Sequence, residues 1–95
     1  MQITFSARHF EASDKLEQFA RKELLRLEKY YDGVMKVDII LEENGSKKEV
    51  EVRLNMLGKL LPTKMDGNDF YKMIPQAIDK IAKQIKATKS KTFSR

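Results

Sequence analysis

VMKVDIILEENGSKKEVEVRLNM, the stretch from residue 34 to residue 56, predicts two antiparallel strands joined by a short turn. Apolar side chains occupy alternate positions on both sides of its centre, which is the pattern of a strand with one buried face. These positions are Val37, Ile39 and Leu41 before the turn, and Val50, Val52, Leu54 and Met56 after it. Asn44-Gly45-Ser46 has the composition of a hairpin turn. We therefore expect a β-hairpin that packs one face against a core.

Two further strands flank this hairpin. Residues 2–8 alternate between apolar and polar side chains, and residues 59–65 do so after a turn at Leu57-Gly58. Pro62 lies in the second of these segments and has no N–H group to donate to a neighbouring strand. Residues 59–65 are therefore expected at an edge of the sheet.

Helical periodicity appears first between the opening strand and the hairpin. Ser13 and Asp14 are candidate N-caps for a helix whose apolar stripe continues to Tyr31. Asp32-Gly33 is expected to end that helix, with the glycine in a positive-φ conformation. This pattern predicts one helix over these residues.

The second helical pattern follows residue 70 and contains Pro75. Its apolar positions are Ile74, Ile78, Ile81, Ala82 and Ile85. Proline is comfortable only in the first turn of a helix, so two alternatives remain. Either the helix begins near Ile74, or residues 70–73 form a separate or kinked piece.

The order strand, helix, three strands, helix predicts an α+β fold with both helices on one face of a four-stranded sheet. A chain of 95 residues is long enough for one such two-layer sandwich and too short for two domains. We therefore expect a single domain over residues 1–95. Its basic end, about residues 86–95, is a candidate flexible segment.

The composition excludes several classes of site. Cysteine is absent, which excludes disulfides, thiolate metal sites and thiol catalysis, and His9 is the single histidine. We find no catalytic constellation and no phosphate-binding glycine loop, so we expect no enzyme activity, no cofactor, no metal and no small-molecule substrate. No apolar run is long enough for a membrane span, and the N-terminus lacks the pattern of a secretory signal. A cytoplasmic protein without a membrane partner is expected.

The net charge of +5 is concentrated at one end of the chain. Residues 1–68 contain 12 basic and 12 acidic side chains, whereas residues 69–95 contain 7 basic and 2 acidic. A solvated helix face usually mixes both signs, but no acidic residue lies between Lys80 and Arg95. We therefore favour a polyanion as partner. Lysines along a helix suit a phosphate backbone rather than base edges, which favours recognition of structured RNA by its shape.

Two aromatic pairs, Tyr30-Tyr31 and Phe70-Tyr71, lie at expected helix ends. Rings at such positions either complete the core or stack on nucleobases. Core packing is the favoured interpretation of both pairs, and base stacking is the alternative.

Several short segments, in their order and spacing, resemble one known family. They are Gln2-Ile3-Thr4, Leu27-Glu28-Lys29-Tyr30-Tyr31-Asp32, Asp69-Phe70-Tyr71, Ala77-Ile78-Asp79-Lys80 and Lys83-Gln84-Ile85-Lys86. The family is that of the ribosome hibernation promoting factors, which includes ribosome-associated inhibitor A. The resemblance covers essentially the whole chain, and the chain looks like the short form of the family.

The resemblance implies a β-α-β-β-β-α fold similar to double-stranded-RNA-binding domains. It also implies binding to the small ribosomal subunit and its rRNA, in the channel between head and body. There the protein would compete with mRNA and with tRNA in the A and P sites, and would reversibly inhibit translation under stress or in stationary phase. The implied rRNA-binding residues are Lys22, Arg26, Lys80, Lys83, Lys86 and Lys89, and additional RNA contacts are expected at Arg8, Lys29 and Lys91.

Two other functions remain open from the sequence. A free-standing double-stranded-RNA-binding module would share the fold and the charge, and would bind naked duplex RNA as well as ribosomes. A module that binds an acidic protein would show little competition by RNA.

Overall fold

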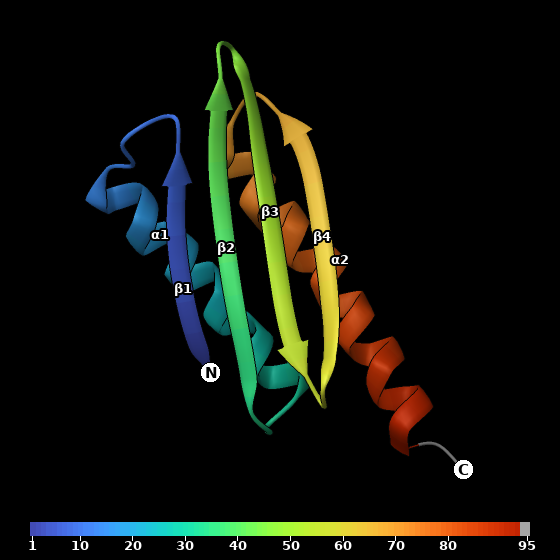
Figure 1. The fold of residues 1–95 in the computed structure, drawn as a ribbon. Helices are drawn as coiled ribbons and strands as arrows, with labels where there is room; N and C mark the ends of the chain where they lie inside the picture. The colour runs from blue at the N-terminus through green and yellow to red at the C-terminus, as the bar shows by residue number, and fades with distance from the viewer. Residues whose placement is uncertain (94–95) are drawn as a thin grey trace.

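The computed structural model describes residues 1–93, which form a four-stranded sheet with the helices on one face (Figure 1). The elements are β1 (Gln2–Arg8), α1 (Asp14–Leu24), the 3₁₀ helix η1 (Leu25–Tyr30), β2 (Met35–Asn44), β3 (Lys47–Met56), β4 (Lys59–Gly67) and α2 (Phe70–Phe93). The predicted α+β class, two-layer architecture and β-α-β-β-β-α order are confirmed. Within residues 1–93, no helix is long and apolar enough to cross a membrane.

The strands lie side by side in chain order, β1-β2-β3-β4. β1 and β2 are parallel because a helical crossover connects them, whereas β2–β3 and β3–β4 are antiparallel hairpins. Gly45 has a φ of 65° at the predicted hairpin turn. β4 is an edge strand, as Pro62 predicted, and Gln84 Nε2 of α2 donates hydrogen bonds to Pro62 O at 3.0 Å and Thr63 Oγ1 at 2.7 Å.

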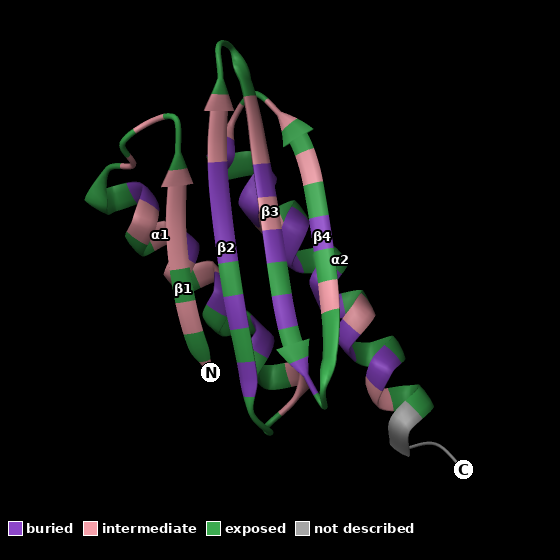
Figure 2. Cartoon of the chain, in the orientation of Figure 1, coloured by how far each residue is buried: buried purple, intermediate pink, exposed green. Residues whose placement is uncertain are grey.

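The core lies between the sheet and the helices (Figure 2). The alternate residues of β2 and β3 that were predicted to face inward are all buried. The helices contribute Leu16, Ala20, Leu24 and Leu27 from α1 and η1, and Ile74, Ile78, Ile81 and Ile85 from α2. Apolar packing therefore fixes one side of each helix and leaves the other side to polar residues.

The first helix differs from its prediction in two ways. The α-helix ends at Leu24 and continues to Tyr30 as a 3₁₀ helix, because Leu24, Leu27 and Tyr30 are spaced by three residues and align on one face at that period. The positive φ expected at Gly33 was wrong, because Tyr31 ends the helix in an extended conformation. A Cβ atom at Gly33 would collide with the ring of Tyr31, so glycine is needed there for close approach.

The second helix is continuous from Phe70, so a start near Ile74 and a separate piece over residues 70–73 were wrong, whereas a kink at this point stays a prediction. Asp69 begins it: Asp69 Oδ1 accepts a hydrogen bond from Tyr71 N at 2.9 Å, and Asp69 O accepts one from Met73 N at 2.9 Å. Pro75 removes the hydrogen bond to the carbonyl of Tyr71, an exposed residue in the first turn, where water can replace it. Within the segment expected to be flexible, residues 86–93 belong to α2, and residues 94–95 lie outside the described residues.

Candidate nucleic-acid interface

The two helical segments run side by side in the same direction on one face of the sheet (Figure 1). Three contacts define this alignment. They join Phe19 to Tyr71 (4.9 Å between ring centroids), Arg26 to Asp79 (3.4 Å between Nη2 and Oδ1) and Tyr30 to Lys89 (2.5 Å between O and Nζ). The contacts follow the same order along both segments. The basic carboxyl-terminal half of α2 therefore lies beside η1.

α2 carries a large excess of positive charge. Between Phe70 and Phe93 it contains six lysines and one acidic residue, Asp79. None of these lysines forms an ion pair with an acidic side chain of residues 1–93. We call its exposed predicted contacts the lysine surface: Lys80, Lys83, Lys86 and Lys91. Ammonium groups that have no acidic partner can bind a phosphate without first giving up another ion pair.

Three lysines, one from η1 and two from α2, contact Tyr30. Lys29 Nζ lies 5.2 Å and Lys86 Nζ 4.9 Å from the centroid of its ring, within the range of cation–π contacts. Lys89 Nζ donates a hydrogen bond to Tyr30 O, at the last residue of η1. Because all three ammonium groups contact the same residue, they add to the positive field at this point of the helical face. The structure thus brings a predicted contact of η1 next to two of α2.

Two of the predicted contacts are engaged within the protein. Arg26 binds Glu23, with 2.8 Å between Nη1 and Oε1, as well as Asp79, and the hydrogen bond to Glu23 raises the pKa of Arg26. Lys89 is half-buried and ties the end of α2 to η1. Lys22, one turn before Arg26, is exposed and has no ion pair in the part of the chain that the structure describes. A direct RNA contact for each of these three residues stays a prediction.

Arg8 lies apart from the helices. In β1, Ile3 and Phe5 pack against the core. Arg8 is an odd number of residues away from both, so its side chain lies on the other face of the sheet, which we call the open face because no helix of residues 1–93 covers it. There Arg8 is in register with Glu42 of β2. The structure therefore does not bring this additional predicted contact to the lysine surface.

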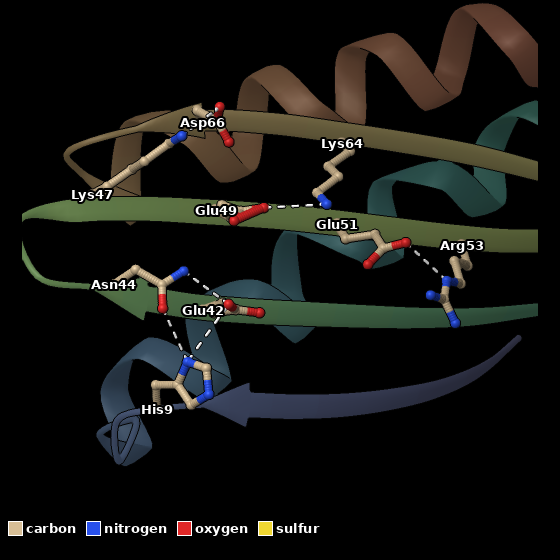
Figure 3. Close-up of polar contacts among 9 residues, drawn as sticks. All are labelled: His9, Glu42, Asn44, Lys47, Glu49, Glu51, Arg53, Lys64 and Asp66. Atoms are coloured by element: carbon tan, nitrogen blue, oxygen red, sulfur yellow. Dashed lines mark hydrogen bonds and ion pairs between the residues drawn. The ribbon is translucent and has the colours of Figure 1, made fainter.

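The open face of the sheet is charged but balanced (Figure 3). Three of its basic side chains pair with acids on the same face. The pairs are Lys47 with Asp66 (3.3 Å), Lys64 with Glu49 (3.3 Å), and Arg53 with Glu51 (2.9 Å). Because these charges offset one another, the positive field of the described residues is concentrated on the helical face.

Sequence reasoning missed the residues that organise this interface. Glu23 lies three residues before Arg26, so that pair was visible as helical spacing. Asp79 is 53 residues from Arg26 and reaches it only because the helices are parallel and in this register. The lysines around Tyr30 depend on the same alignment, which no local pattern predicts.

Comparison with known proteins identifies the family. A sequence model described as Sigma 54 modulation protein / S30EA ribosomal protein matches residues 3–92. The chain belongs to this family. The resemblance noted in the sequence is therefore confirmed.

Relatives of the chain carry consistent names. A ribosome hibernation promoting factor of Pseudomonas putida is 28% identical over 94 residues, covering 99% of this chain and 92% of that protein. One of Escherichia coli is 26% identical over 91 residues, covering 96% of each. The N-terminal domain of Thermus thermophilus Protein Y has a TM-score of 0.84 at 27% identity and covers 93% of this chain and 99% of its own. A ribosomal subunit interface protein of Coxiella burnetii has a TM-score of 0.86 at 23% identity and covers 95% of this chain and 99% of its own. At this identity the likeness supports the fold alone.

Proposed function

We propose that this protein is a ribosome hibernation factor that binds the small ribosomal subunit in the channel between head and body. There it occupies the path of mRNA and the A and P sites of tRNA, and it reversibly inhibits translation under stress or in stationary phase. The observation that carries the proposal is a lysine surface that has no acidic partners among residues 1–93, in a member of this family. A role on ribosomes places the protein in the cytoplasm.

Binding in this proposal depends on phosphates. Lys80, Lys83 and Lys86 lie on exposed sides of one helix, which fixes the spacing of their Cα atoms along its axis and leaves each flexible side chain free to reach a phosphate. Lysine acts as a point charge and contacts phosphate oxygens without reading base edges. The fold therefore selects RNA by the arrangement of its backbone, which suits a folded rRNA surface.

Sedimentation with ribosomal components tests the partner directly. The protein should sediment with purified small subunits and not with large subunits, and naked duplex RNA should compete weakly. Equal binding to duplex RNA and to small subunits would instead favour the free-standing double-stranded-RNA-binding module. Binding that RNA fails to displace would indicate an acidic protein as partner.

Affinity for small subunits should fall steeply with salt. If about five lysines each neutralise one phosphate, the logarithm of the binding constant should fall against the logarithm of salt concentration with a slope of roughly −4. A fourfold rise in salt then weakens binding roughly 250-fold. Lys83→Gln should make the slope shallower by about one, whereas Lys36→Gln on the open face of the sheet should not change it. A slope near zero for the unmodified protein would mean that phosphates do not dominate the contact.

Removing the acid from α2 should strengthen binding. Asp79→Asn takes one negative charge from the helix and leaves Arg26 with Glu23 alone, so affinity for small subunits should rise roughly two- to fivefold. The melting temperature should change little because the Arg26–Asp79 pair is exposed. Asp38→Asn, which removes an exposed carboxylate from the open face, is the matched control and should leave affinity unchanged. Weaker binding by Asp79→Asn would show that the carboxylate positions Arg26 for RNA.

A further inference from the structure

Tyr71 is the exception among the aromatic residues at the helix ends. Tyr30 and Tyr31 pack against the core, and Phe70 is 4% exposed and stacks on Phe10 with 5.3 Å between centroids, as core packing predicted. Tyr71 is 41% exposed and lies on the ring of Phe19, with 4.9 Å between centroids and 56° between ring planes. One aromatic ring is therefore held on another while much of it remains open to solvent.

The ring of Tyr71 is held on an ordered part of the fold. Phe19 is half-buried and packs against the core, so it forms a firm support beneath the tyrosine. The backbone of Tyr71 is fixed by its hydrogen bond to Asp69 Oδ1 at 2.9 Å, in the first turn of α2. A ring positioned in this way loses little conformational entropy when a flat ligand stacks on it.

Three exposed lysines and the carboxylate of Asp69 lie close in sequence to this aromatic pair, and the balance of these charges favours an anionic ligand. Lys15 and Lys22 lie four residues before and three residues after Phe19, which places them on the same side of α1. Lys72 follows Tyr71 on α2. All three lysines are exposed, and none has an ion pair with an acidic side chain of residues 1–93.

We propose that Tyr71, supported by Phe19, stacks on an unpaired nucleobase, while Lys15, Lys22 and Lys72 neutralise the phosphates beside it. The proposal rests on RNA as the partner, as in the proposed function, and adds a single-stranded nucleotide to its ligands. Aromatic rings beside a basic surface are the usual platform for single-stranded nucleic acid. Lys86 of the lysine surface lies 15 residues further along α2, about 22 Å at the helical rise, and on nearly the same side of the helix as Tyr71, so a strand of a few nucleotides can reach both the platform and the lysine surface.

Fluorescence of a tryptophan at position 71 can report directly on stacking at the platform. The chain contains no tryptophan, so Tyr71→Trp introduces a single indole whose fluorescence reports on that site alone. A short single-stranded RNA should quench this fluorescence by stacking. A sugar–phosphate strand of the same length without bases should bind the lysines and leave the fluorescence nearly unchanged. Equal quenching by both strands would overturn the proposal.

Affinity measurements separate stacking from charge. Tyr71→Leu should bind the single-stranded RNA and small subunits about tenfold more weakly, because one stacked base is lost. Its salt slope should equal that of the unmodified protein, because every lysine remains. Tyr71→Phe should bind normally, since stacking needs the ring and not the hydroxyl. Leu60→Ala, which shortens an exposed apolar side chain of β4, is the control and should have no effect.

Two outcomes distinguish this proposal from the proposed function. If Tyr71→Leu melts normally and binds both RNA and small subunits as tightly as the unmodified protein, the stacking platform is refuted while ribosome binding stands. If the unmodified protein fails to sediment with small subunits but still prefers the RNA strand over the strand without bases, the proposed function is refuted and the platform is supported. If Tyr71→Leu is destabilised, the test is the fluorescence of Tyr71→Trp with each of the two strands. Quenching by the RNA and not by the strand without bases supports the stacking platform, and equal quenching refutes it.

Discussion

Changing Lys80, Lys83 and Lys86 together to glutamate is expected to abolish binding to small ribosomal subunits. The three residues are half of the six lysines of α2, and they are exposed and have no acidic partners among residues 1–93. Losing three phosphate contacts weakens binding on the order of 1,000-fold at moderate salt, and the new carboxylates add repulsion. A titration by sedimentation or fluorescence anisotropy measures the loss.

The fold should survive this triple substitution. All three side chains are exposed, so no apolar core contact is removed. Lys86 loses its contact with the ring of Tyr30, and glutamates in the second half of α2 oppose the helix dipole. We therefore expect an unchanged circular dichroism spectrum and a melting temperature only slightly lowered.

A charge-matched control places the effect on the helical face. Lys36, Lys47 and Lys64 are exposed lysines on the open face of β2, β3 and β4, and changing them to glutamate alters the net charge by the same amount. Their contribution to binding should be small because they lie on the sheet, where charges of both signs are mixed. An equal loss of affinity in this control would show that net charge, and not the lysine surface, governs binding.

The sequence patterns that predicted structure correctly were those carried by neighbouring residues. Alternation through Val50, Val52 and Leu54 reports which side of a strand is buried, and the Gly45 turn brings the next strand beside it. The lysine spacing along α2 follows from one helix in the same way. Local patterns were therefore sufficient to predict the two-layer fold. They also predicted which side of α2 carries the positive charge.

Two predictions failed because a nearby side chain overrides the usual role of a glycine or a proline, and others could not be made because they depend on contacts between distant parts of the chain. Gly33 was expected to end a helix by its own conformation, but the ring of Tyr31 decides its role. Pro75 was expected to mark a helix start or to follow a separate or kinked piece, but Asp69 begins one continuous helix earlier. The charges around Tyr30 depend on the alignment of two helices, and the sequence of either helix alone does not determine it.

Inhibition of translation by this protein is expected to be stoichiometric and reversible. A protein that lies in the path of mRNA and tRNA excludes them by occupying their space, and the competition must be mutual because both bind the same surface. Added protein should therefore reduce binding of initiator tRNA to small subunits, and excess mRNA with tRNA should displace the protein. Inhibition should saturate at about one protein per ribosome, and washing at high salt should restore activity if the contacts are ionic, as proposed.

The glutamate variant of Lys80, Lys83 and Lys86 turns this expectation into a test of mechanism. If occupancy is the cause, the variant should lose inhibition in proportion to its loss of binding, and the sheet control should retain both. Inhibition far below one protein per ribosome, or inhibition that persists after the protein is removed, would indicate chemical damage to the ribosome. Unchanged tRNA binding on fully occupied small subunits would place the site outside the tRNA path. If the protein inhibits by occupying the tRNA path, then affinity, tRNA exclusion and inhibition must change together. A variant in which one of these three quantities changes without another is therefore sufficient to reject this mechanism.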